Sequence, residues 1–107
     1  MTPKKIYISG KITGTDDYMQ RFEEAEKALN NMFPGVSVIN PAKVNAAMPT
    51  DTTYEQYMAM SFTMLDMCDT IYMMQGWERS NGAKKEIIKA KELGLKILYQ
   101  VIEEDKI

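Results

Sequence analysis

The chain has 107 residues, of which 45% are hydrophobic and 26% are charged, a composition typical of one globular domain. It has no histidine and one cysteine, which excludes a Ser-His-Asp triad, an imidazole-ligated metal site, an intramolecular disulfide and a CxxC redox pair. The net charge of −2 argues against a nucleic acid polymer as partner, because phosphate binding needs a basic face. Enzymatic chemistry would therefore rest on carboxylates, hydroxyls, lysine or a bound cofactor.

Other features of the sequence indicate the location and the domain organisation of the chain. No run of about 18 apolar residues occurs, so we expect no membrane span. The absence of a secretory signal and the single cysteine favour a cytoplasmic location. No repeat or linker divides the sequence, which predicts one domain over residues 1–107.

Hydrophobic patterning predicts alternating strands and helices. The predicted strands are residues 5–9, 36–40, 69–74 and 95–101. The predicted helices are one that Asp16 caps and Pro34-Gly35 ends, one over residues 54–67, and one over residues 81–93 that Ser80 caps and Gly94 ends. Residues 42–53 are predicted to be irregular. The expected buried positions are Tyr18, Phe22, Ala25, Leu29 and Met32 in the first helix, and Tyr57, Met60, Met64 and Leu65 or Met67 in the second.

This β-α-β-α-β-α-β order predicts an α/β fold of three layers, flavodoxin- or Rossmann-like. Its mainly parallel sheet has four to five strands, with helices on both faces. Ligands of such sheets bind at the carboxyl ends of the strands. Residues 9–15, 40–53 and 75–81 meet there, so we expect the functional site in these loops.

The loop after the first strand is Ser9-Gly10-Lys11-Ile12-Thr13-Gly14. Its two glycines allow a ligand to approach the backbone, and free N–H groups there can hold an anion. The loop matches neither GxGxxG nor a Walker A sequence. By itself, such a loop is more often explained by two glycines that only form a turn.

A second pattern starts at Gly76-Trp77 and runs through Ser80 and Gly82-Ala83 to Glu86. Ser80 opens a helix, where the dipole and unpaired N–H groups favour a phosphate or a sugar hydroxyl. Glu86 follows Gly82 by one turn on the same face, which directs its carboxylate toward the ligand-binding edge of the sheet. The alternative is that Ser80 is only a cap and that Glu86 is exposed and paired with Lys89.

Two other side chains, Tyr7 and Trp77, have two interpretations each. Tyr7 belongs either to the core or to the site, through its hydroxyl, and Trp77 either stacks on an aromatic ligand or covers the sheet edge. Asp69 is expected at the amino end of the sheet, in a structural role. Cys68 is expected to be a small buried apolar residue.

Four segments resemble the nucleoside 2-deoxyribosyltransferase-like superfamily, and within it most closely DUF4406, a family of small domains of unknown function. The segments are residues 7–14, Asn40-Pro41-Ala42, residues 68–72 and residues 76–86. The resemblance covers almost the whole chain. It implies cleavage of the N-glycosidic bond of a 2′-deoxynucleoside or its 5′-monophosphate, followed by transfer of the sugar to a second base or to water.

The resemblance also implies residue roles. Glu86 matches a helix glutamate that attacks the anomeric carbon, a carboxylate mechanism that needs no histidine, and Tyr7 is the second expected catalytic residue, orienting Glu86 or the sugar. The expected substrate-binding residues are Ser9, Gly10, Lys11, Ile12, Thr13, Trp77, Ser80, Asn81 and Gly82. No cofactor and no metal are expected, and relatives imply a homodimer or higher homo-oligomer.

The sequence departs from the family pattern at two positions. Ser80 stands where the transferases have an aspartate, and a hydroxyl at a helix N-terminus suits a 5′-phosphate better than a carboxylate does. The phosphate-binding branch has an arginine where Thr13 stands, and Lys11 is a substitute for its charge. Ser61 stands where many relatives have a catalytic aspartate that protonates the leaving group.

Two alternatives to an enzyme stay open. The loss of the aspartate at Ser61 fits a nucleotide-binding module without turnover, which nucleotides would stabilise without release of base. The methionines of the second helix, Met58, Met60, Met64 and Met67, fit a dimer face of an interaction protein.

Overall fold

The computed structural model describes residues 2–101 and contains one parallel four-stranded sheet in the order β2-β1-β3-β4. The strands are β1 (Lys5–Ser9), β2 (Ser37–Ile39), β3 (Thr70–Met73) and β4 (Lys96–Tyr99). The helices are α1 (Tyr18–Met32), α2 (Pro41–Ala46), α3 (Tyr54–Asp66) and α4 (Asn81–Glu92), with a 3-10 turn, η1 (Trp77–Arg79). The predicted α/β fold with a parallel sheet and helices on both faces is confirmed.

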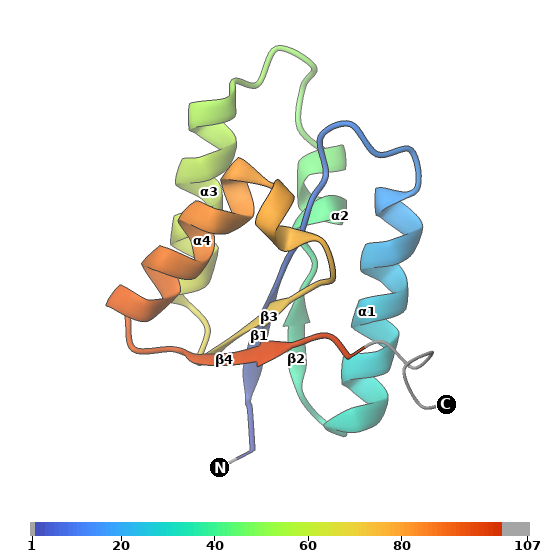
Figure 1. Cartoon of the computed structure of the whole chain (residues 1–107), viewed down its shortest axis with the longest axis vertical. Coiled ribbons are helices and arrows are strands. Elements are labelled where there is room, and N and C mark those ends of the chain that lie inside the picture. The colour runs from blue at the N-terminus through green and yellow to red at the C-terminus, as the bar shows by residue number, and fades with distance from the viewer. Residues whose placement is uncertain (1, 102–107) are drawn as a thin grey trace.

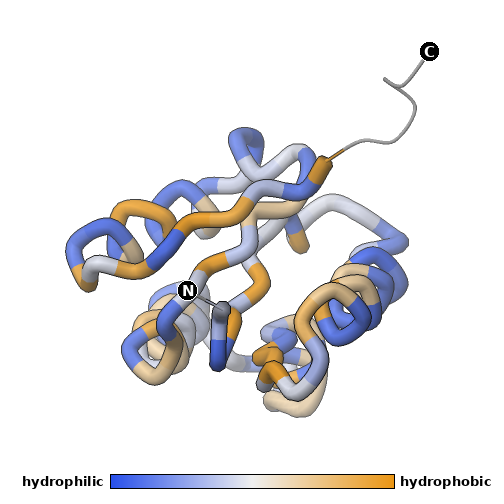
Figure 2. The backbone as a smooth tube through the Cα atoms, turned by 90° about the horizontal axis from the view of Figure 1, so that it is seen from below, coloured by the Kyte–Doolittle hydropathy of each residue, from blue (hydrophilic) through white to orange (hydrophobic). Residues whose placement is uncertain are grey.

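The sheet lies between two helical layers, with α1 and α2 on one side and α3 and α4 on the other (Figure 1). Side chains alternate along β1, so that Ile6 and Ile8 pack with Phe22 of α1, whereas Tyr7 packs with Leu65 of α3. The colours of Figure 2 place hydrophobic residues along the central strands and many hydrophilic ones on the outer sides of the helices. These two hydrophobic cores, one on each face, support the sheet beneath the loops that follow its strands.

Local sequence signals explain most helix ends. Thr53 and Gln56 form a reciprocal capping box at the start of α3, and the Ser80 side chain accepts a hydrogen bond from the Ala83 amide at the start of α4. Gly94 has φ of 77° directly after α4, as expected for a terminating glycine. The predicted cap at Asp16 is wrong. Asp17 occupies the N-cap of α1 without a side-chain capping bond and instead pairs with Arg21.

The prediction of an irregular segment over residues 42–53 is wrong in its first part, because α2 spans Pro41–Ala46, and is confirmed for residues 47–53, which form no helix or strand. The Asn40 side chain accepts a hydrogen bond from the Ala42 amide, and Pro41 occupies the first turn, where its missing N–H leaves no bond unmade. This short helix carries Asn45 toward the carboxyl end of the sheet.

The buried faces of α1 and α3 differ in part from the expected stripes. Met32 is exposed at the end of α1. In α3 the buried residues are Met58, Ser61 and Leu65. Leu65 is buried as predicted, whereas Met58 and Ser61, one of them a hydroxyl residue, take the places expected for Tyr57 and Met60. Met58 faces the cavity described below and Met64 packs on the core, whereas Met67 is exposed. The four methionines therefore do not share one exposed face.

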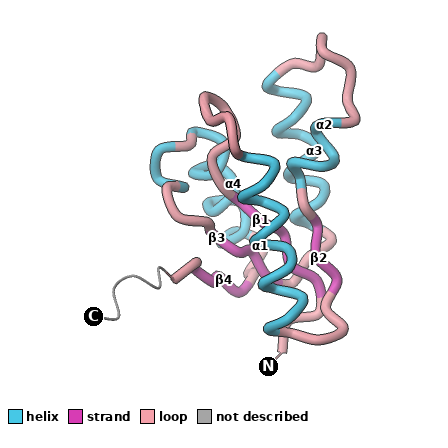
Figure 3. The backbone as a smooth tube through the Cα atoms, turned by 90° about the vertical axis from the view of Figure 1, so that its right-hand side faces the viewer, coloured by secondary structure: helices cyan, strands magenta, loops and turns pink. Residues whose placement is uncertain are grey.

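The segments that follow β1, β2 and β3 gather at one end of the molecule, as the loop placement in Figures 1 and 3 shows. At the opposite end, the Asp69 carboxylate accepts hydrogen bonds from the Lys4 and Lys5 amides. Asp69 thus lies at the amino end of the sheet, as expected. None of the helices within residues 2–101 is long and apolar enough to cross a membrane.

Gly10, directly after β1, has little room for a side chain. An added Cβ would lie 3.0 Å from the Met74 sulfur, 3.1 Å from the Met74 Cβ and 3.4 Å from a Phe22 ring carbon. We expect Gly10→Ala to lower the free energy of unfolding by about 1–3 kcal/mol, the usual effect of overpacking. Chemical denaturation measures this, with Gly82→Ala as the matched control. An unchanged midpoint for Gly10→Ala would show that Met74 moves aside freely.

Candidate active site

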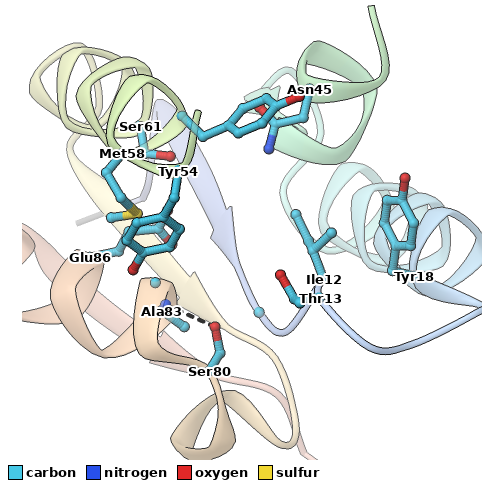
Figure 4. A pocket seen from close by; sticks show the side chains of 13 residues that line it. Ile12, Thr13, Tyr18, Asn45, Tyr54, Met58, Ser61, Ser80, Ala83 and Glu86 are labelled. Atoms are coloured by element: carbon cyan, nitrogen blue, oxygen red, sulfur yellow. Dashed lines mark hydrogen bonds between the residues drawn. The ribbon is translucent and has the colours of Figure 1, made fainter. Parts of the chain in front are cut away.

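A cavity of about 240 Å³ opens at the carboxyl end of the sheet, between the loop after β1 and the helices α2, α3 and α4. Its lining residues are Gly10, Ile12, Thr13, Tyr18, Asn45, Tyr54, Tyr57, Met58, Ser61, Ser80, Gly82, Ala83 and Glu86. In Figure 4, Ile12, Thr13 and Tyr18 lie on one side of this space and Tyr54, Met58, Ser80 and Glu86 on the other. The volume lies just below the roughly 300–1,000 Å³ of typical ligand pockets, which suits a ligand of nucleoside size.

Glu86 is a buried carboxylate at the inner wall of the cavity, with 7% of its surface exposed. The Ser9 hydroxyl donates a hydrogen bond of 2.6 Å to Oε1, and the Tyr7 hydroxyl donates one of 2.8 Å to Oε2. Both donors stand on the same face of β1, two residues apart. The strand therefore fixes both carboxylate oxygens, and Glu86 reaches the ligand space in a single orientation.

The hydroxyl of Ser61, on α3, is the third hydroxyl near the carboxylate of Glu86. It lies 3.0 Å from the Tyr7 hydroxyl, so that Tyr7, Ser9 and Ser61 all support the carboxylate of Glu86. Burial raises the pKa of Glu86, although the hydrogen bonds from Ser9, Tyr7 and Ser61 oppose that rise. Burial and the nearby carboxylate also raise the pKa of Tyr7 well above its ordinary value, so its phenol keeps its proton.

The alternative role for Glu86, an exposed residue paired with Lys89, is wrong. Lys89 lies 4.0 Å from Glu92 in an exposed pair, while Glu86 points inward with Ala83 and Ile87 on the buried side of α4. Within residues 2–101, no lysine or arginine forms an ion pair with Glu86. A buried carboxylate without such a partner is costly to keep ionised, and such groups are common at functional sites.

The N-terminus of α4 forms the outer wall. Ser80 Oγ accepts a hydrogen bond of 3.0 Å from the Ala83 amide, which leaves its own proton available for a ligand. The amino group of Lys11 donates to the Arg79 carbonyl at 3.3 Å, which brings a positive charge to the segment before Ser80. Gly82 leaves the first turn of the helix open between them and Glu86.

The structure brings together many of the residues that the sequence singled out. Gly10, Ile12, Thr13, Ser80 and Gly82 line the cavity directly. Tyr7 and Ser9 act through Glu86, because they hold its carboxylate without lining the space.

Besides Ser9, three expected binding residues lie outside the cavity lining. Asn81 is exposed in the first turn of α4, and Lys11 contacts the loop before that helix. Trp77 lies over Tyr99, with ring centroids 6.5 Å apart, and lines a separate depression with Gln75 and Gln100. Trp77 thus packs at the β4 edge of the sheet, away from Glu86.

The sequence placed residues 40–53 at the site but named no binding residue in the wall formed by α2, α3 and the start of α1. This wall contributes Asn45, Tyr54, Tyr57, Met58 and Tyr18. Two signals point to these residues. The Asn40-Pro41 dipeptide is typical of a helix start and would have predicted α2. The capping box at Thr53 fixes where α3 begins, and with it the face that carries Met58 and Ser61.

In the part of the chain that it describes, the structure provides neither a reactive thiol nor a metal site. Cys68 is buried, and burial raises the pKa of its thiol to about 11, which makes it a poor nucleophile at neutral pH. Within residues 2–101, no three carboxyl or thiol groups are placed to hold a metal ion.

The open first turn of α4 gives a test of the cavity. A Cβ at Gly82 would meet Met58, Ser80 and Tyr54 only at 3.4–3.9 Å, so a small side chain fits but points into the ligand space. We expect Gly82→Ala to fold at least as stably as the original chain, and Gly82→Leu to fold but to weaken the binding of a ligand in this cavity by at least about tenfold, or 1.4 kcal/mol. Calorimetric titration measures this, and equal affinities for all three chains would place the ligand elsewhere.

Comparison with known proteins agrees with this architecture. The family model of DUF4406, a domain of unknown function, matches residues 4–99. A solved structure of a 2-deoxyribosyltransferase from the bacterium Bacillus psychrosaccharolyticus aligns with a TM-score of 0.69 and 14% identity, over 94% of this chain and 78% of that one. At this identity the likeness concerns the fold, and a search of curated proteins finds no match. Since the family model extends from β1 to β4, the chain belongs to the DUF4406 family.

Proposed function

We propose that this protein cleaves the N-glycosidic bond of a nucleoside or nucleotide, with Glu86 as the nucleophile. The observation that carries this proposal is the buried Glu86 carboxylate, fixed by the Tyr7 and Ser9 hydroxyls and presented to a cavity of nucleoside size. The likeness in fold to a 2-deoxyribosyltransferase supports the same reaction class.

The proposed reaction has two steps. A carboxylate oxygen of Glu86 bonds to the anomeric carbon while the bond from that carbon to the base breaks, and the electron pair leaves with the base. The second step is attack by water, which loses a proton and regenerates the carboxylate, or by a second base, which completes a transfer. The Tyr7 and Ser9 hydrogen bonds oppose the rise in the pKa of Glu86 that burial causes, and they orient its carboxylate for the first step.

We propose that the sugar carries a 5′-phosphate. A phosphate near Ser80 would receive the free hydroxyl proton of that residue and lie at the positive end of the α4 dipole. The Lys11 amino group lies close to the same segment and would add a full positive charge. A 2′-deoxynucleoside 5′-monophosphate placed in this way sets its anomeric carbon toward Glu86.

The test is incubation of the purified protein with 2′-deoxynucleosides and their 5′-monophosphates, followed by chromatography of the released base. The proposal predicts release that is faster from the monophosphates and absent with Glu86→Gln. Binding of monophosphates without release from any of them would instead support a binding module, which the serine at position 61 favours.

A further inference from the structure

The charged side chains that line the cavity are negative only. Among its lining residues, all within the described part of the chain, Glu86 is the one carboxylate and none is lysine or arginine. Tyr18, Tyr54 and Tyr57 add three aromatic rings to the same lining. Lys85 lies 4.9 Å from the centroid of the Tyr54 ring but does not line the space. A buried carboxylate beside aromatic rings favours a ligand with a positive charge.

The same lining offers no second carboxyl group to protonate a departing base. Both oxygens of Glu86 already accept hydrogen bonds from Ser9 and Tyr7, and the nearest group from α3 is the hydroxyl of Ser61. A serine hydroxyl does not release a proton at neutral pH, and the Tyr7 pKa is raised well above its ordinary value. General acid catalysis contributes about 10²–10⁴ to such reactions, so a base that needs a proton in order to leave is at a disadvantage here.

We infer that the substrate is an N-glycoside whose base is itself a cation at the glycosidic bond, such as a pyridinium or a 7-alkylpurinium. This inference rests on the proposed function and narrows it to a class of leaving group. The cationic base lies among the tyrosine rings beside Glu86, and a 5′-phosphate lies at the rim by Ser80 and Lys11. The two ends of the ligand therefore match the two ends of the site in charge.

The bond changes balance without an acid. The Glu86 carboxylate forms a bond to the anomeric carbon, and the electron pair of the breaking bond neutralises the positive ring nitrogen of the base. The base departs as a neutral molecule and takes up no proton. Water then attacks the sugar ester, gives a proton to solvent and frees Glu86 as a carboxylate.

The experiment compares kcat/KM at neutral pH for nicotinamide mononucleotide, 7-methylguanosine 5′-monophosphate and the 5′-monophosphates of deoxycytidine and deoxyadenosine. We expect the cationic bases to be released at least about 100-fold faster, the lower end of the contribution of a general acid. The first two substrates distinguish a pyridinium from an alkylpurinium. Reduced nicotinamide mononucleotide, which has a similar shape but an uncharged ring, is expected to inhibit only weakly.

A pair of variants tests the aromatic contact. We expect Tyr54→Leu to raise the KM for nicotinamide mononucleotide at least about threefold more than Tyr54→Phe does, because only the second keeps the ring. Neutral bases released as fast as cationic ones would overturn the inference and leave the proposed function standing. Release of no base from any of these substrates would overturn the proposed function itself.

Discussion

We expect replacement of Glu86 by glutamine to abolish base release and at the same time to raise the melting temperature at neutral pH. The activity falls by about 10⁴-fold or more, because the amide cannot form the bond to the anomeric carbon. The stability rises because burial disfavours the charged form of Glu86, which the neutral amide avoids. Glutamine keeps the size of the side chain and can still accept a hydrogen bond from Ser9 or Tyr7.

The direction of the Glu86 pKa shift determines how the stabilisation by Glu86→Gln changes with pH. The pKa of Glu86 is raised in the folded chain. The favourable contribution of Glu86 to the free energy of unfolding is therefore fully present below its ordinary pKa of 4.5 and is lost as the pH rises through the raised value. The stabilisation by Glu86→Gln therefore grows from acid to neutral pH. Thermal unfolding at several pH values measures it, with Glu92→Gln, at the exposed end of the same helix, as control. A lower melting temperature for Glu86→Gln at neutral pH would contradict the account of the buried charge.

Tyr7→Phe removes one of the two short hydrogen bonds to Glu86 and keeps the ring that packs in the core. A hydrogen bond to a charged group contributes about 1.5–3 kcal/mol, so we expect kcat to fall by roughly 10- to 100-fold. That hydrogen bond also lowers the pKa of Glu86, so its loss moves the acid limb of the pH–rate profile to higher pH. Steady-state kinetics over a range of pH measures both changes.

Tyr72→Phe is the matched control for this variant. Tyr72 is also a buried tyrosine of the central sheet, but it faces the opposite core, with Ile8 and Phe22. We expect its removal of a hydroxyl to leave the pH–rate profile in place. A Tyr7→Phe profile with an unmoved acid limb would mean that the Tyr7 hydroxyl does not tune Glu86.

The sheet could be predicted because its strands are short, apolar and separated by clear stop signals. Thr70–Met73 is buried throughout, as a central parallel strand must be, and its hydrophobic run is visible in the sequence. Gly82, Ala83 and Glu86 were likewise predictable, since the spacing of one helical turn places them on one face. The partners of Glu86 required the fold, because Tyr7 lies 79 residues away along the chain.

The wall of the cavity formed by α2 and α3 was harder to predict. Helix α2 has six residues, too few to show a hydrophobic period, and only its Asn-Pro start marks it. In α3 the buried face includes Ser61, and a polar residue on an inner face is invisible to a search for apolar stripes. Trp77 looked like a stacking residue from its place beside the glycine motif, but η1 turns it toward Tyr99.

The most direct test of the central claim is a search for the sugar attached to Glu86. The protein is mixed with substrate, quenched in acid within the first turnover, digested and analysed by mass spectrometry. The account predicts a peptide that contains Glu86 and carries the mass of one substrate sugar residue, with the modification on the Glu86 side chain and absent from Glu86→Gln. Base release with Glu86 unmodified, or with the sugar on another residue, would contradict it.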